Sequence, residues 1–178
     1  MKKKFILVFT ALALMFSLVA CGASETANAK TTVDEFIKAV KELDQEKMLS
    51  LVASDEKADL DVTEDVDKES SEYKSGKAMV SKLAGSYVSG EVAKDATETT
   101  LKYKVDSPDI QTMIGDMYAK VLKGEKTENL EIKEEDIKVV QKDVDFKLVK
   151  EDGAWKIKDV KPLMMDMMNL GGLSQFVK

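Results

Sequence analysis

Histidine and arginine are absent from this 178-residue sequence, which also has one cysteine and two prolines. Without histidine, the base that activates serine or cysteine nucleophiles is missing. The composition also excludes zinc sites built from histidine and cysteine. It likewise excludes arginine side chains that bind anions in a bidentate manner. A single cysteine permits no disulfide within the chain, so the packed core must supply the stability. We therefore expect a protein without a cofactor that is not an enzyme.

The charge of the chain argues against nucleic acid as a partner. The formal net charge is −6, and it becomes −9 for the 158 residues that remain when the first 20, with their three lysines, are removed. Phosphate neutralisation by basic side chains supplies most nucleic-acid affinity, and this acidic chain has no basic cluster. Its length is that of one ordinary domain.

The first 20 residues have the pattern of a secretory signal. Lysines at positions 2–4 precede an apolar run from Phe5 to Ala20, and small residues end that run. The run is shorter than the roughly 20 residues that a spanning helix needs. A cleaved signal is therefore expected rather than a transmembrane helix.

The residues Leu18, Val19, Ala20 and Cys21 resemble the lipobox of bacterial lipoproteins. That resemblance implies diacylglyceryl transfer to the Cys21 sulfur, cleavage after Ala20, and anchoring by acyl chains at the extracytoplasmic face of a bacterial membrane. The alternative is a plain cleaved signal with an incidental cysteine. The expected organisation is a signal peptide at 1–20, a lipidated flexible tether at 21–31, a domain at 32–161 and a methionine-rich apolar tail at 162–178.

Helices are expected at the start of the domain. Thr32 and Glu35 match a capping box, and apolar residues follow at helical spacing. The acidic segment 54–72 is interpreted as a solvated loop. A calcium loop is the alternative, but Glu64 and Ser70 occupy positions that an EF-hand reserves for glycine and glutamate.

Four antiparallel strands are expected after these helices, with a helical insertion between the second and third. Alternation is clearest from Thr97 to Val105, and Glu151-Asp152-Gly153 has the composition of a hairpin turn. Ser107-Pro108-Asp109 should end the second strand and open the inserted helix, with the proline in its first turn. The pattern predicts an α+β fold with helices on one face of the sheet.

Three stretches carry a family resemblance. Residues Phe36 to Val52 and the hairpin Val144 to Val160 are similar to the first helices and final hairpin of nuclear-transport-factor-2-like, cystatin-like domains. The passage Val105 to Asp109 resembles uncharacterised secreted lipoproteins of that superfamily. The resemblance implies a strongly bent sheet that forms a cone open to a small ligand or peptide. Its expected lining is Phe36, Tyr87, Tyr103, Phe146 and Trp155.

Three functions follow from these observations. We expect a lipid-anchored binding or interaction module, whose ligand is a small molecule or an envelope protein and whose oligomeric state stays open. A ketosteroid-isomerase-like enzyme is one alternative. Its candidate groups are Tyr87, Tyr103, Tyr118, Asp106 and Asp145. Soft-metal (copper) binding is the other, through the thioethers of Met164, Met165, Met167 and Met168, although a helix that plugs apolar surface is the preferred interpretation of these methionines.

Overall fold

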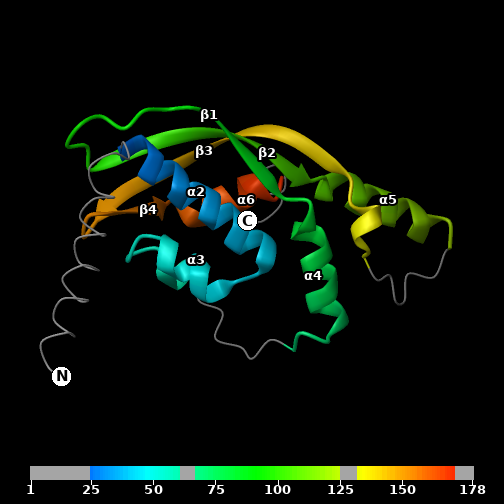
Figure 1. The fold of residues 1–178 in the computed structure, drawn as a ribbon. Helices are drawn as coiled ribbons and strands as arrows, with labels where there is room; N and C mark the ends of the chain where they lie inside the picture. The colour runs from blue at the N-terminus through cyan, green and yellow to red at the C-terminus, as the bar shows by residue number, and fades with distance from the viewer. Residues whose placement is uncertain (1–24, 61–66, 125–131, 171–178) are drawn as a thin grey trace, which may run out of the picture.

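Helices cover one face of a four-stranded antiparallel sheet in the computed structural model, which describes residues 25–60, 67–124 and 132–170 (Figure 1). The strand order is β1-β2-β3-β4, and α5 connects β2 to β3, so the expected α+β fold with its inserted helix is confirmed. The elements are α2 (Glu25–Glu42), α3 (Gln45–Leu51), η1 (Lys57–Asp59), α4 (Ser71–Ser81), β1 (Ala84–Ser89), β2 (Glu98–Pro108), α5 (Ile110–Leu122), η2 (Glu134–Asp136), β3 (Val139–Glu151), β4 (Ala154–Lys158) and α6 (Val160–Met167).

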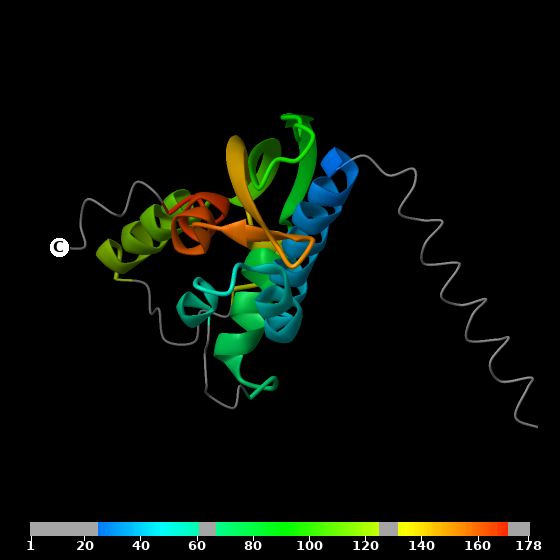
Figure 2. The same ribbon diagram turned by 90° about the vertical axis from the view of Figure 1, so that its left-hand side faces the viewer.

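The sheet twists but does not curl into a cone, so the expectation of a strongly bent sheet is wrong (Figures 1 and 2). Strands β2 and β3 pair in continuous register from Glu98–Val149 to Pro108–Val139. Strong local bending of a sheet needs a bulge that interrupts such a ladder. In the described part of the sheet, the register shifts between Tyr87 and Ser89 on the short edge strand β1, where it cannot bend the two long strands.

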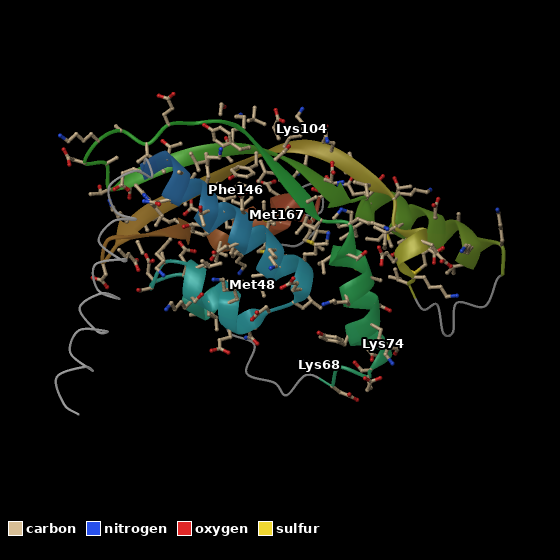
Figure 3. The ribbon with its side chains drawn as sticks, viewed as in Figure 1. Met48, Lys68, Lys74, Lys104, Phe146 and Met167 are labelled. Atoms are coloured by element: carbon tan, nitrogen blue, oxygen red, sulfur yellow. The ribbon has the colours of Figure 1, made fainter. Side chains whose placement is uncertain are left out.

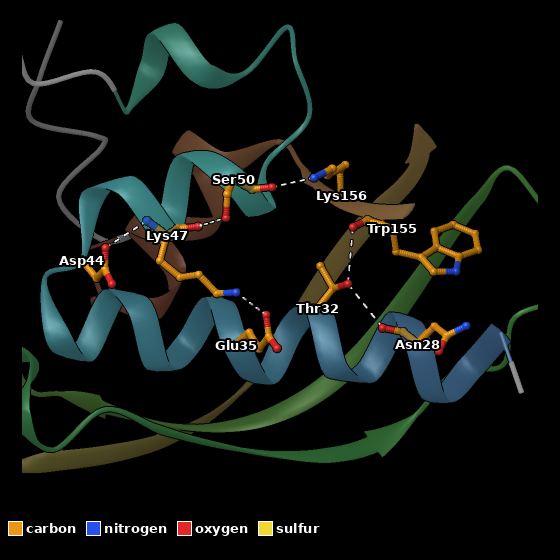
Figure 4. Close-up of polar contacts among 8 residues, drawn as sticks. All are labelled: Asn28, Thr32, Glu35, Asp44, Lys47, Ser50, Trp155 and Lys156. Atoms are coloured by element: carbon orange, nitrogen blue, oxygen red, sulfur yellow. Dashed lines mark hydrogen bonds and ion pairs between the residues drawn. The ribbon is translucent and has the colours of Figure 1, made fainter. Parts of the chain in front are cut away.

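Helix α2 begins at Glu25, seven residues before the predicted start. Thr32 lies inside this helix and is not its N-cap, so the predicted capping box is wrong and residues 25–31 are helical rather than a flexible tether. The physical reason is that Ala29 continues the apolar face of the helix by one turn and is fully buried. The hydroxyl of Thr32 instead lies 3.3 Å from the main-chain oxygen of Trp155 on β4 (Figure 4).

The core lies between α2 and the inner face of the sheet. Alternate residues of the long strands point inward, and Leu101, Tyr103 and Phe146 are fully buried. In Figure 3, Phe146 lies between the sheet and α2, whereas Lys104 lies on the outer face. Burial of one such large apolar side chain contributes about 1.5–3 kcal/mol.

Short segments close the margins of this core. Val52, which follows α3, forms a parallel bridge with Ile157, and the main-chain nitrogen of Ala53 donates to the Ile157 oxygen at 2.8 Å. This contact covers part of the edge of β4, where unpaired main-chain groups would otherwise remain. Asp44 and Ser70 cap the N-termini of α3 and α4 with their side-chain oxygens. Contacts with the sheet hold the segment after α3, and side-chain caps stabilise the N-termini of α3 and α4.

Candidate interaction surface

The residues expected to line a cavity mostly belong to the packed core. Phe36, Tyr103 and Phe146 are fully buried, and Trp155 is 4 % exposed. The Tyr103 ring contacts the rings of Tyr87 and Phe146 edge-on, with centroids 5.8 and 5.2 Å apart. Such edge-to-face contacts are typical of aromatic packing in protein interiors. These aromatic side chains therefore pack against one another beneath the sheet.

The hydroxyl groups of the two inner tyrosines are used in contacts within the fold. The Tyr103 hydroxyl donates to the main-chain oxygen of Lys30 on α2, 3.3 Å away, and the Tyr87 hydroxyl donates to the Gly90 oxygen. Burial raises the pKa of Tyr103, and the nearby carboxylate of Asp34 adds to that increase. Tyr103 therefore stays protonated at physiological pH.

Of the residues considered for isomerase chemistry, Tyr87 and Tyr103 contact each other, whereas no hydrogen bond or ion pair among the described residues joins them to Asp106, Asp145 or Tyr118. Tyr103 points into the core, whereas Asp145 lies on the outer face of the sheet and pairs with Lys102 at 3.4 Å. Asp106 accepts a hydrogen bond from the Gln141 side chain at 2.9 Å. Tyr118 is 66 % exposed on α5. A general base and an oxyanion donor must reach the same substrate, whereas Tyr103 and Asp145 lie on opposite faces of the sheet.

A polar groove of about 280 Å³ lies between α2 and α3. Its lining is charged except for Ala39, and the other members are Glu35, Lys38, Glu42, Asp44 and Lys47. The Lys47 ammonium and the Glu35 carboxylate pair across the groove at 2.6 Å (Figure 4). Lys47 also donates its main-chain N–H to the Asp44 cap at 2.9 Å. These charges are satisfied by one another and join the two helices.

The described residues contain no group of three or more Asp, Glu, His or Cys side chains placed to hold a metal ion. In the acidic segment 54–72, positions 61–66 lie outside the described residues, and with them Asp61, Thr63, Glu64 and Asp65 of the calcium-loop alternative. Cys21 and the lipobox residues Leu18, Val19 and Ala20 lie outside as well.

The methionines of the C-terminal region pack on the core rather than gathering their sulfurs in solvent. Met167 is fully buried, and Met164 on α6 and Met168, which follows that helix, pack against the buried cluster. Met165 is half-buried. Unbranched, polarizable methionine suits an irregular gap of this kind. This placement favours the interpretation of α6 as a packing helix.

Helix α5 exposes apolar side chains that no other described element covers. It contains no buried residue. Its most exposed apolar members are Met117 at 46 %, Tyr118 at 66 %, Val121 at 50 % and Leu122 at 87 %. The sequence pattern predicted a helix at this place in the chain, between the second and third strands. A contiguous exposed apolar face is typical of an interaction site.

Polar contacts fix the start of α5 to the sheet. Asp109 caps the helix, and its main-chain nitrogen donates to the Lys138 oxygen at 2.8 Å. The Lys138 ammonium pairs with Asp116 at 2.9 Å, a contact that lowers the pKa of Asp116 and raises that of Lys138. Lys120 is exposed one turn after Asp116, and its charge adds to the lowering of the Asp116 pKa. The helix therefore presents an apolar face with the exposed Lys120 on the same helix.

The start of α2 is held at the opposite end of the sheet by contacts that the sequence analysis missed. The Glu25 carboxylate lies 2.8 Å from the Lys150 ammonium and accepts from the Trp155 indole nitrogen at 2.9 Å. The Thr26 hydroxyl accepts from the main-chain nitrogen of Val92 at 3.0 Å. Ala29 lies one helical turn before Val33, and this spacing was the sequence signal that could have predicted the earlier start of α2.

This fold and these surfaces define an α+β domain with an exposed amphipathic helix. No protein-family model, curated protein or solved structure matches the chain. Among the helices that the structure describes, none is long and apolar enough to cross a bilayer.

Proposed function

We propose that this chain is a bacterial lipoprotein whose domain binds another envelope protein through α5 and catalyses no reaction. Acyl chains on Cys21 would hold it at the extracytoplasmic face of the membrane. The observation that carries the proposal is the apolar face of α5, which no other described element covers, in contrast with the packed aromatic core beneath the sheet. We propose a cystatin-like relationship as a matter of element order alone, since the sheet lacks the curl of a cone.

The chemistry of α5 defines the partner. Met117 belongs to the exposed face, and methionine adapts to partner surfaces of varied shape. The exposed Lys120 adds positive charge on the same helix. The complementary surface is an apolar patch of a protein with carboxylates at its rim. Charge at a rim governs association rate more than affinity, so we expect binding that salt slows.

The anchor is tested on protein isolated from a bacterial membrane. Intact-mass analysis should find a mature chain that begins at Cys21 and carries acyl mass. The Cys21→Ser variant should be released from the membrane while the domain stays folded, as judged by circular dichroism. Membrane attachment of Cys21→Ser that equals the wild type would exclude the lipoprotein assignment.

The binding surface is tested by a photo-crosslinking side chain at Tyr118, compared with the same group at Val88, an exposed position on β1. A partner protein should crosslink at position 118 and not at 88. The purified partner should then bind the domain with at least tenfold lower affinity when Met117 and Leu122 are both replaced by lysine. Crosslinks to lipid or to a second copy of the chain would contradict the proposal, as would a small molecule retained in native mass spectrometry of the domain.

A further inference from the structure

We infer that the end of the domain where α2 begins faces the lipid surface, and that α5 points away from it. The inference rests on the proposed acyl anchor at Cys21. It assigns one end of the fold to the bilayer and the other to the protein partner. Two observations support the inference: the short length of chain between Cys21 and Glu25, and the contacts that fix Glu25 to the sheet.

The chain length limits how far the domain can lie from its anchor. Gly22, Ala23 and Ser24 separate Cys21 from Glu25. Even fully extended, this connection spans at most about 14 Å. The Cα atom of Glu25 therefore lies within that distance of the acylated residue.

Glu25 itself is not on a loose arm. Its two carboxylate oxygens contact Lys150 on β3 and Trp155 on β4. Thr26 accepts from the main chain of Val92, which belongs to the connection between β1 and β2. Three segments are thus tied together at the start of α2, and all three must lie near the bilayer. Side-chain contacts of this kind position the whole domain relative to its anchor.

The long strands place α5 at the other end. Glu98 pairs with Val149 at the end of the sheet that holds Lys150, and Pro108 pairs with Val139 at the far end. The ten residue steps of β2 between them span about 34 Å. Helix α5 starts directly beyond Pro108, so its apolar face lies away from the anchored end (Figure 1). A bilayer contact by α5 would require the domain to lie flat.

Charge does not attract the anchored end of the domain to the bilayer. Carboxylates outnumber lysines in the connections at the anchored end: Glu91, Asp95, Glu151 and Asp152 stand against Lys94, with Lys150 paired to Glu25. Anionic lipid attracts basic segments and repels acidic ones. The short connection, rather than attraction to headgroups, therefore keeps this end at the membrane.

Energy transfer to an acceptor lipid tests the orientation in the full acylated protein. Acylation blocks the thiol of Cys21, so a donor dye can be attached to one new cysteine, either Lys94→Cys near the anchor or Lys120→Cys on α5. In vesicles of phosphatidylcholine and phosphatidylglycerol, transfer from position 94 should be several-fold higher than from position 120. A flexible Gly-Ser insertion after Ser24 should lower the transfer at 94 without changing the fold.

Each result separates the orientation from the anchor. Equal transfer at both positions, or higher transfer at 120, in a protein that floats with the vesicles and carries acyl mass would overturn the orientation alone. A chain without acyl mass on Cys21 would remove the anchor and the orientation together. Transfer at 94 that the insertion leaves unchanged would show that the short connection does not position the domain.

Discussion

The Glu25 carboxylate accepts a hydrogen bond from the indole nitrogen of Trp155, 2.9 Å away and 130 residues further along the chain. The Lys150 ammonium holds the other oxygen of the same carboxylate at 2.8 Å. Together the contacts lower the pKa of Glu25 below its ordinary value of 4.5. Trp155 is the only tryptophan of the chain, so its fluorescence observes this contact directly.

The contact should therefore be visible in a pH titration. A pKa that is lower in the folded than in the unfolded state gives stability that is fully present above pH 4.5 and is lost as pH falls through the folded value. We expect Trp155 emission to titrate with a midpoint below 4.5 in the wild type. The Glu25→Gln variant, which has no carboxylate there, should show a flat emission over the same range.

A matched variant distinguishes this contact from general acid effects. Glu46 is an exposed acid in the first turn of α3 without an ion pair to any described residue. Glu46→Gln should keep the wild-type emission titration. If Glu25→Gln titrates as the wild type does, a different group controls the Trp155 environment.

Two glycines should respond in opposite directions to replacement by alanine. Gly90 has a φ of +114°, and a Cβ there would lie 2.6 Å from the main-chain oxygen of Thr100. We expect Gly90→Ala to lower the free energy of unfolding by about 2–3 kcal/mol. Gly76 lies inside α4 with open space around it, so Gly76→Ala should raise stability by about 0.5–1 kcal/mol. Urea denaturation measures both, and equal effects of the two changes would contradict the strain at Gly90.

Ser107 should be more stable as alanine. It is fully buried on β2, and its hydroxyl has no hydrogen-bond partner among the described residues. An unsatisfied buried hydroxyl is destabilising, so Ser107→Ala should raise the free energy of unfolding by about 1 kcal/mol. Thr32→Val removes a hydroxyl that contacts the Trp155 oxygen and should lower stability by about 1 kcal/mol. A loss of stability in Ser107→Ala comparable to that in Thr32→Val would show that the Ser107 hydroxyl is bonded.

Local patterns predicted the sheet well because strand alternation and turn chemistry act over a few residues. The alternation around Leu101 and Tyr103 predicted the inward face of β2. At the predicted hairpin turn, Glu151 pairs with Ala154, which leaves two residues in the loop. Asp152 and Gly153 have φ values of 50° and 82°, as such a turn requires. The composition of this segment determines its conformation locally.

The start of α2 and the shape of the sheet depend on contacts far apart in the sequence. Residues 25–31 are mostly polar, like a linker, and besides the buried Ala29 their contacts with β3, β4 and the β1–β2 connection stabilise them as helix. Likewise, the alternation in β2 and β3 indicates which face is buried, but not that their pairing continues without a bulge. Helical periodicity in α5 similarly identifies an apolar face, but it cannot tell what covers that face.

Methionines on α5 and α6 should differ sharply in their effect on stability. Met117 is 46 % exposed on a helix without buried residues, so Met117→Lys should change the free energy of unfolding by less than about 0.5 kcal/mol. Met167 is fully buried against the core, and Met167→Ala should cost about 2–5 kcal/mol because it leaves a cavity. Chemical denaturation of each purified variant gives these values. A surface site should lose no more than about 0.5 kcal/mol. If Met117→Lys instead lost more than about 1 kcal/mol, the face of α5 would be covered within the chain itself and would not be open to a partner.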